Sequence, residues 1–184
     1  MPNAILALNL CHCHMKDFLF ILIVLFMTPL HSQDIVIPAF LEKWENSKSY
    51  LVAIAEAMPQ EKYDFKPTER QKDFQDQLLH IKSNMDWLSS TYFGRQLSET
   101  GSANNSPLTK GETIKLLVDG FDGVSAILKN TSADVLSEKV EFFAGEKTKL
   151  QILNLLQDHV THHRGQLIVY LNLNNIEPPK YVGW

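Results

Sequence analysis

Four stretches of this chain place apolar side chains at the three- and four-residue spacing of an amphipathic helix, at about residues 38–58, 71–93, 110–129 and 148–174. No stretch shows the sustained alternation of apolar and polar residues that is typical of a half-buried strand. Four amphipathic helices must bury their apolar faces against one another. We therefore predict an all-α protein with the fold of an up-down four-helix bundle.

The first 32 residues have the layout of a secretory signal peptide. Lys16 follows Met15, an apolar run extends from Phe18 to Met27, and small or polar residues lead to Ser32. The run is too short for a comfortable transmembrane helix. We predict cleavage after residue 32, although Leu30 is an unusual residue three positions before the cut, and an uncleaved N-terminal anchor is the alternative. The bundle domain would then span residues 33–184.

The motif "CHCH" at residues 11–14 resembles half of a metal site, but it precedes Met15, which is the better start for a signal peptide. Residues 1–14 are then an over-called start or an extended N-terminal region, and either would be discarded. Both cysteines of the chain lie in this motif. The exported domain would therefore have no thiol to form a disulfide, attack a substrate or bind a metal.

Charge and composition exclude some partners. The net charge is −4 and lysines and arginines form no cluster, so we expect no nucleic-acid partner. After cleavage we expect no stable membrane span, and localisation would be periplasmic or secreted.

Three histidines occur in "HVTHHRGQ" on the fourth predicted helix. At about 100° per residue, His163 falls within the apolar face, His159 on its flank and His162 towards solvent. His159 and His163 are one turn apart, so both rings can reach one point. HExxH zinc helices space their histidines in the same way, but this helix lacks the glutamate.

A zinc site with an open position usually has three protein ligands. His80, in "QLLHIKSNMDW" on the second predicted helix, is the remaining histidine of the exported domain. It lies at the edge of that helix's apolar stripe, which suits a partly polar cavity between helices. From the residues alone, a glutamate or aspartate could also supply the third ligand.

The combination of "LLHI", "HVTHHRGQ" and "NIEPPKY" resembles the DinB family, also called DinB-like or YfiT-like metalloenzymes. The resemblance extends over the exported domain and includes "YDFKPTE" and "VEFFAGEKTK". It implies a four-helix bundle that holds a divalent metal ion, zinc or nickel, through His80, His159 and His163. It also implies, for some relatives, thiol S-transfer or isomerisation with low-molecular-weight thiols such as bacillithiol or mycothiol.

A divalent ion held by three neutral imidazoles would activate water for hydrolysis or bind a thiol as thiolate. Because the thiols of those relatives are kept inside cells, the predicted export favours a metal-dependent hydrolase acting on an unknown small molecule. The alternatives are a DinB-type thiol S-transferase and a non-enzymatic, metal-stabilised binding protein. A homodimer is expected from relatives.

Four further residues are candidates around the site, while the sequence indicates no catalytic acid or base. Asp76, one turn before His80, could orient that ring as a hydrogen-bond acceptor. Trp87, Asn84 and His162 could line a substrate pocket, with a packing role as the alternative for Trp87.

Overall fold

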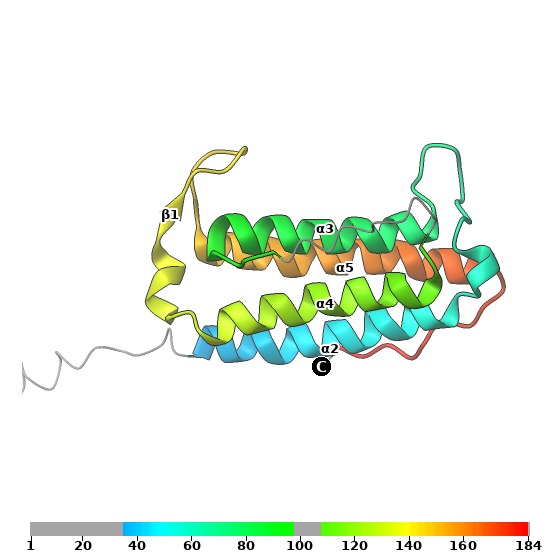
Figure 1. The fold of residues 1–184 in the computed structure, drawn as a ribbon, viewed down its shortest axis with the longest axis horizontal. Helices are drawn as coiled ribbons and strands as arrows, with labels where there is room; N and C mark the ends of the chain where they lie inside the picture. Colours follow the sequence, from blue (N-terminus) through cyan, green and yellow to red (C-terminus); the bar gives the residue numbers. More distant parts are fainter. Residues whose placement is uncertain (1–34, 98–107, 184) are drawn as a thin grey trace, which may run out of the picture. The chain divides into compact units, whose positions relative to one another are not determined.

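In the computed structural model, which describes residues 35–97 and 108–183, four long helices pack into a bundle (Figure 1). They are α2 (Val36–Ala57), α3 (Phe74–Phe93), α4 (Lys110–Lys129) and α5 (Lys149–Leu173). The predicted all-α bundle is confirmed, and the predicted helix limits differ from those observed by at most three residues.

Local hydrogen bonds explain where three of the helices begin. The Asp73 side chain accepts a hydrogen bond from the Asp76 backbone N–H at 2.7 Å, so α3 begins at Phe74. Thr109 and Thr148 each form a reciprocal capping box, with Glu112 and Gln151 respectively, at the starts of α4 and α5. These caps satisfy backbone donors that have no partner within the first helical turn.

The helices do not alternate in direction around the bundle: α3 and α4 run the same way, with α2 and α5 opposed to them (Figure 1). Hydrogen bonds at one end of the bundle agree with this. Gln75, in the first turn of α3, donates to the Leu108 carbonyl at 2.9 Å, and Lys110 donates to the Met58 carbonyl at 2.8 Å. Both α3 and α4 therefore begin where α2 ends.

Of the three pairs of consecutive helices, only α3 and α4 are among the main packing partners. Helix α3 packs mainly on α4 and α5, and α2 packs mainly on the same two helices. The consecutive helices α2 and α3 therefore lie on a diagonal, and α3 lies beside α5. This arrangement positions the candidate site, because the histidines predicted on the second and fourth helices share one interface.

The core is a single apolar cluster to which all four helices contribute. Among its largest fully buried side chains are Trp44, Phe74, Phe121 and Tyr170, one from each helix. The Trp44 indole N–H donates to the Phe121 carbonyl at 3.1 Å, which satisfies its polar atom inside the core. At Gly120 a β-carbon would lie 3.0 Å from the Met85 methyl group, so the missing side chain allows α4 to approach α3 closely.

The connection between α4 and α5 contains regular structure of its own. It contains a short 3-10 helix, η3 (Ala133–Ser137), and an antiparallel pair of two-residue strands, β1 (Lys139–Val140) and β2 (Lys147–Thr148). Gly145 supplies the positive φ of 86° that the turn between the strands requires. A second 3-10 helix, η2 (Gln60–Lys62), follows α2.

The predicted signal peptide and the "CHCH" motif lie outside the residues that the structure describes, so both remain predictions. None of the described helices is long and apolar enough to cross a membrane.

Candidate metal centre

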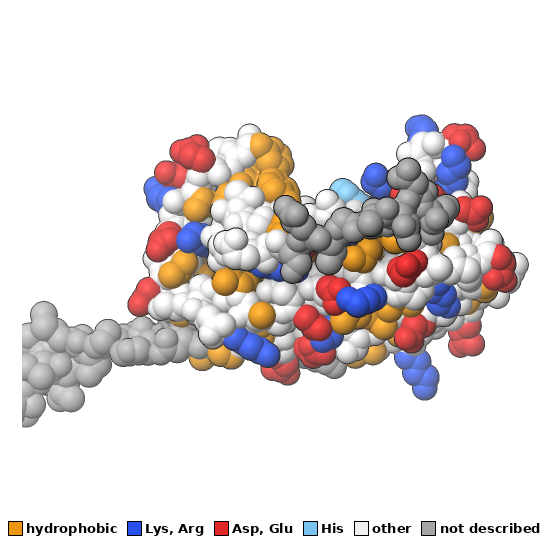
Figure 2. Space-filling view, viewed as in Figure 1, with side chains coloured by type: hydrophobic (Ala, Val, Ile, Leu, Met, Phe, Trp, Pro, Cys, Tyr) orange, Lys and Arg blue, Asp and Glu red, His pale blue; other side chains and the backbone are white. Residues whose placement is uncertain are grey.

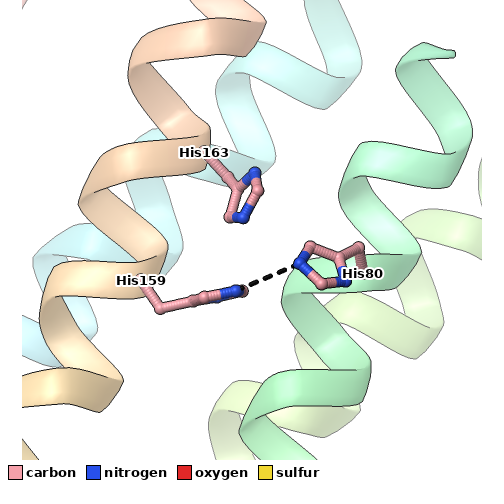
Figure 3. A group of neighbouring side chains, drawn as sticks. All are labelled: His80, His159 and His163. Atoms are coloured by element: carbon pink, nitrogen blue, oxygen red, sulfur yellow. Dashed lines mark hydrogen bonds between the residues drawn. The ribbon is translucent and has the colours of Figure 1, made fainter. Parts of the chain in front are cut away.

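Three histidine side chains meet at the interface of α3 and α5 (Figure 3). His80 projects from α3, while His159 and His163 project from successive turns of α5. One ligand-type nitrogen from each ring lies within 4.8 Å of the other two. None of the three side chains is exposed. The predicted candidate ligands are thus brought together, and the group could hold a metal ion.

The separation of two of these nitrogens fits a metal site. The Nε2 atoms of His80 and His159 face each other at 3.2 Å. Two imidazole nitrogens bound to one tetrahedral zinc ion, with bonds of about 2.0–2.1 Å, lie about 3.3 Å apart. The donor set is neutral nitrogen, which suits zinc, nickel, copper or iron. The residues present therefore fit a divalent transition metal.

A buried chain of hydrogen bonds fixes the orientation of His163. Its Nδ1–H donates to Oε1 of Gln77 at 2.8 Å. The Gln77 amide group donates in turn to the Tyr170 hydroxyl at 3.3 Å, and that hydroxyl donates to the Lys72 carbonyl at 2.8 Å. Because Nδ1 carries the hydrogen, Nε2 keeps its lone pair free for a ligand bond.

The surroundings keep the three rings neutral. Burial lowers the pKa of His159 to about 4, with further lowering by His163 and His80. Burial also lowers the pKa of His163 to about 4, assisted by the nearby His80. The pKa of His80 is lowered by burial and by the positive charge of Lys72. Neutral imidazole is the form that binds metal, so the site is prepared for an ion near neutral pH.

The other residues predicted around the site have mixed surroundings. His162 is exposed, and its ring nitrogen receives a hydrogen bond from the Gln166 amide at 3.0 Å. Asp76 is exposed too, with its backbone N–H bonded to the α3 cap. Trp87 is 40% exposed, whereas Asn84 is partly buried and its Oδ1 has no hydrogen-bond partner among the described residues. Their predicted roles remain predictions.

Sequence reasoning missed the role of Gln77. It is only 5% exposed and makes a direct hydrogen bond to a candidate ligand ring, which is the interaction proposed above for Asp76. Its position three residues before His80 was a signal, because residues three apart share a helix face. The partner ring lies 86 residues away, and only the packing of α3 on α5 reveals it.

The fold and the histidine group together define the class of this protein: an all-α bundle with a candidate metal centre between two of its helices. The sequence model of the DinB family matches residues 29–181. The chain therefore belongs to the DinB family. A comparison with curated proteins gave no match.

Solved structures support the fold. A DinB-like protein from Bacillus subtilis is 19% identical, with a TM-score of 0.65, and the match covers 79% of this chain and 99% of that one. A DinB-like protein from Bacillus cereus is 16% identical, with a TM-score of 0.67 and coverage of 78% and 95%. A conserved protein from Enterococcus faecalis is also 16% identical, with a TM-score of 0.53 and coverage of 75% and 96%.

Proposed function

We propose that His80, His159 and His163 bind one divalent metal ion and that the protein is a metal-dependent hydrolase of a small organic substrate. The observation that supports this most is the meeting of three neutral imidazoles, two of them with Nε2 atoms 3.2 Å apart. Three protein ligands on a tetrahedral ion leave one position for water or substrate, which is the pattern of catalytic rather than structural zinc sites.

The residues of this chain would divide the work as follows. The three rings hold the ion, and Gln77 holds the His163 ring in the tautomer that leaves Nε2 free. The bound ion would supply Lewis-acid chemistry, lowering the pKa of a water molecule or thiol at its open position towards neutrality. The positive charge of Lys72 lowers the pKa of both His80 and His163, which indicates that it lies near the site. It would therefore attract a substrate with negative charge.

Export is part of the proposal and rests on the signal-peptide pattern before residue 33. Outside the cytoplasm water is the abundant co-substrate, whereas low-molecular-weight thiols are kept within cells. We therefore favour hydrolysis over DinB-type thiol transfer as the reaction of this protein. We propose zinc as the bound metal, because imidazole is one of its common ligands, and nickel as the alternative. Fractionation of the producing cells tests export, and a full-length product found only in the cytoplasm would contradict it.

The first experiment measures metal content. The domain from residue 33 onward is purified, and its bound metals are counted by elemental mass spectrometry before and after incubation with zinc or nickel. We expect about one ion per chain, lost in His80→Ala and His163→Ala. His162→Ala is the matched control on the same helix and should keep the ion. Absence of metal in the wild type, even after incubation, would end the metal-enzyme proposal.

The second experiment separates the reactions. Metal-loaded protein is assayed with 4-nitrophenyl acetate and bis(4-nitrophenyl) phosphate without thiol, and with an electrophilic aryl halide plus added thiol. Turnover without thiol that is lost in His80→Ala supports hydrolysis. Turnover that requires a thiol would replace the hydrolase with a transferase. Stoichiometric metal with no turnover in either assay would support a metal-stabilised binding protein instead.

A further inference from the structure

Four aromatic side chains form a cluster where the hairpin β1–β2 meets α3. Trp87 and Tyr92 come from α3, and Phe142 and Phe143 come from the turn between the strands. The ring centroids of Phe142 and Phe143 are 4.2 Å apart, and the Trp87 ring stacks on both at 5.9 and 6.3 Å. Tyr92 completes the cluster at 6.4 Å from Trp87 and 6.0 Å from Phe142.

Part of this aromatic cluster is exposed to solvent. Phe143 is 84% exposed and Trp87 is 40% exposed, and neither belongs to the core. The turn that carries Phe143 is held in place, because the Gly145 backbone N–H donates to the Phe142 carbonyl at 2.9 Å and the paired strands flank it. The surface thus presents ordered aromatic rings with one face free, which suits a flat apolar ligand.

The aromatic cluster stands beside the histidines. His80, Asn84 and Trp87 are separated by four and three residues, so they line one face of α3, and Trp87 lies about 10 Å along the helix from His80. Figure 2 shows the surface hollowed between the hydrophobic hairpin and the charged segment that precedes α3, with a histidine side chain at the floor. Asn84, between the two ends, has a buried Oδ1 without a partner among the described residues.

A lysine side chain belongs to the other end of this hollow. Lys72 lies in the segment before α3, where its carbonyl accepts a hydrogen bond from the Tyr170 hydroxyl. The same hydroxyl is linked through Gln77 to His163, which fixes the Lys72 backbone close to the histidine group, and the Lys72 charge lowers the pKa of both His80 and His163. A bound divalent ion would add further positive charge at this end of the hollow. An anionic group is therefore the complement of this end.

We propose that the hollow binds a small organic anion with an aromatic ring, whose ring lies on the aromatic cluster and whose acidic group lies over the histidines near Lys72. This assigns a substrate class to the hydrolase proposed above. The reaction rests on that proposed function, whereas the binding of the ligand does not, because the aromatic cluster and Lys72 are independent of the metal. The distance to be spanned, about 10 Å along α3 from His80 to Trp87, is comparable to the whole end-to-end length of a bicyclic aromatic acid and exceeds that of a single-ring benzoate.

The test measures binding of 2-naphthoate by calorimetry, to both the zinc-loaded and the metal-free domain. Phe143→Ala and Trp87→Leu should each weaken binding between about 2-fold and 12-fold, the range expected for one aromatic pair. Lys72→Gln should weaken it about 2- to 5-fold, as for an exposed ion pair. The matched controls are Leu173→Ala, an apolar residue of α5 that is 56% exposed, and Lys129→Gln, an exposed lysine on α4, and both should bind as the wild type does.

Two further ligands test the two halves of the proposal. The neutral 2-naphthalenemethanol lacks the charge and cyclohexanecarboxylate lacks the aromatic ring, so both should bind more weakly than 2-naphthoate. Equal binding of all three ligands, or unchanged binding in Phe143→Ala and Lys72→Gln, would overturn the proposal. A dimer in sedimentation that Phe143→Ala dissociates would also overturn it, because a second copy would then cover the aromatic cluster.

Failure of this ligand proposal can be distinguished from failure of the proposed hydrolase function. If the domain binds no metal but 2-naphthoate binding still depends on Phe143 and Lys72, the hydrolase fails and the ligand site stands. If metal binds and these variants have no effect, the metal centre stands and the substrate class is wrong.

Discussion

The His163 imidazole donates its Nδ1–H to the Gln77 amide oxygen across the α3–α5 interface at 2.8 Å. Gln77 is buried, and its amide nitrogen is held by the Tyr170 hydroxyl. The orientation of a candidate ligand is thus set by a neighbouring helix rather than by its own. A buried donor that loses its acceptor costs about 1–3 kcal/mol, so this hydrogen bond should matter to both metal affinity and stability.

We expect Gln77→Leu to weaken zinc binding by about 10- to 100-fold, because the His163 ring would lose the acceptor that selects its tautomer. Competition with a chromogenic chelator measures the change. Gln166→Leu is the matched control: Gln166 is a second acceptor for the same Nδ1–H, at 3.1 Å, on a less buried side chain. A larger loss in Gln166→Leu than in Gln77→Leu would contradict the assigned order.

Zinc should raise the melting temperature of the domain. A ligand that binds only the folded state at a free concentration 100-fold above its Kd adds about 2.7 kcal/mol to the free energy of unfolding. For a domain of about 150 residues this corresponds to an increase of about 5–10 °C. Differential scanning fluorimetry should show the increase in the wild type and in His162→Ala but not in His80→Ala. An equal increase in all three proteins would mean that zinc binds elsewhere.

The metal-free domain should lose stability as the pH falls from 6.5 to 4. His159 and His163 have pKa values of about 4 when folded and 6.5 when unfolded. Between these pH values the unfolded chain binds protons that the folded chain does not, so the free energy of unfolding is complete above pH 6.5 and decreases below it. Allowing for partial solvent screening, the pair should account for about 3 kcal/mol.

Urea unfolding at a series of pH values measures this decrease. Carboxylates also begin to titrate near pH 4, so the variant His159→Asn/His163→Asn is the reference. Its stability should change less than that of the wild type between pH 6.5 and 5. Parallel curves for the two proteins would show that the histidines are not buried in neutral form.

Removing the cap of α5 should affect stability without affecting metal affinity. Thr148→Ala removes the side-chain acceptor for the Gln151 backbone N–H and should cost about 1 kcal/mol, or about 2–4 °C in melting temperature. His159 lies about 16 Å further along the helix, so zinc affinity should remain within about 2-fold. The control Thr161→Ala, at an exposed position of the same helix, should melt close to the wild type. A zinc affinity that falls with the cap would indicate a site sensitive to helix fraying.

The bundle was predictable because its determinants are local. The apolar spacing within α4 and the Thr109 cap require no knowledge of the rest of the chain, and the predicted helix coincides with residues 110–129. The inward direction of His159 and His163 also follows from helix geometry, as does the exposure of His162. The helical state of a segment and the direction of its side chains depend on residues within that segment and can be derived from it.

Properties that depend on which helices adjoin could not be derived in this way. Alternation in direction is the default for four helices, yet α3 and α4 run parallel. Their relative direction depends on the route of the connecting segments, which the sequence of those segments does not determine. The hydrogen bond from His163 to Gln77 depends on the same choice, because it joins α5 to α3. The hairpin carrying Phe143 was also missed, since two-residue strands are too short to show alternation.

The order of the candidate ligands along the chain has a consequence for how the protein matures. His80 is synthesised 79 residues before His159, and His159 and His163 both belong to the last helix. A nascent chain that has not yet produced α5 holds one of the three histidines, and a lone imidazole is a weak ligand. Metal capture at the proposed site would therefore follow synthesis of α5, and a filled site would indicate that α3 and α5 have packed together.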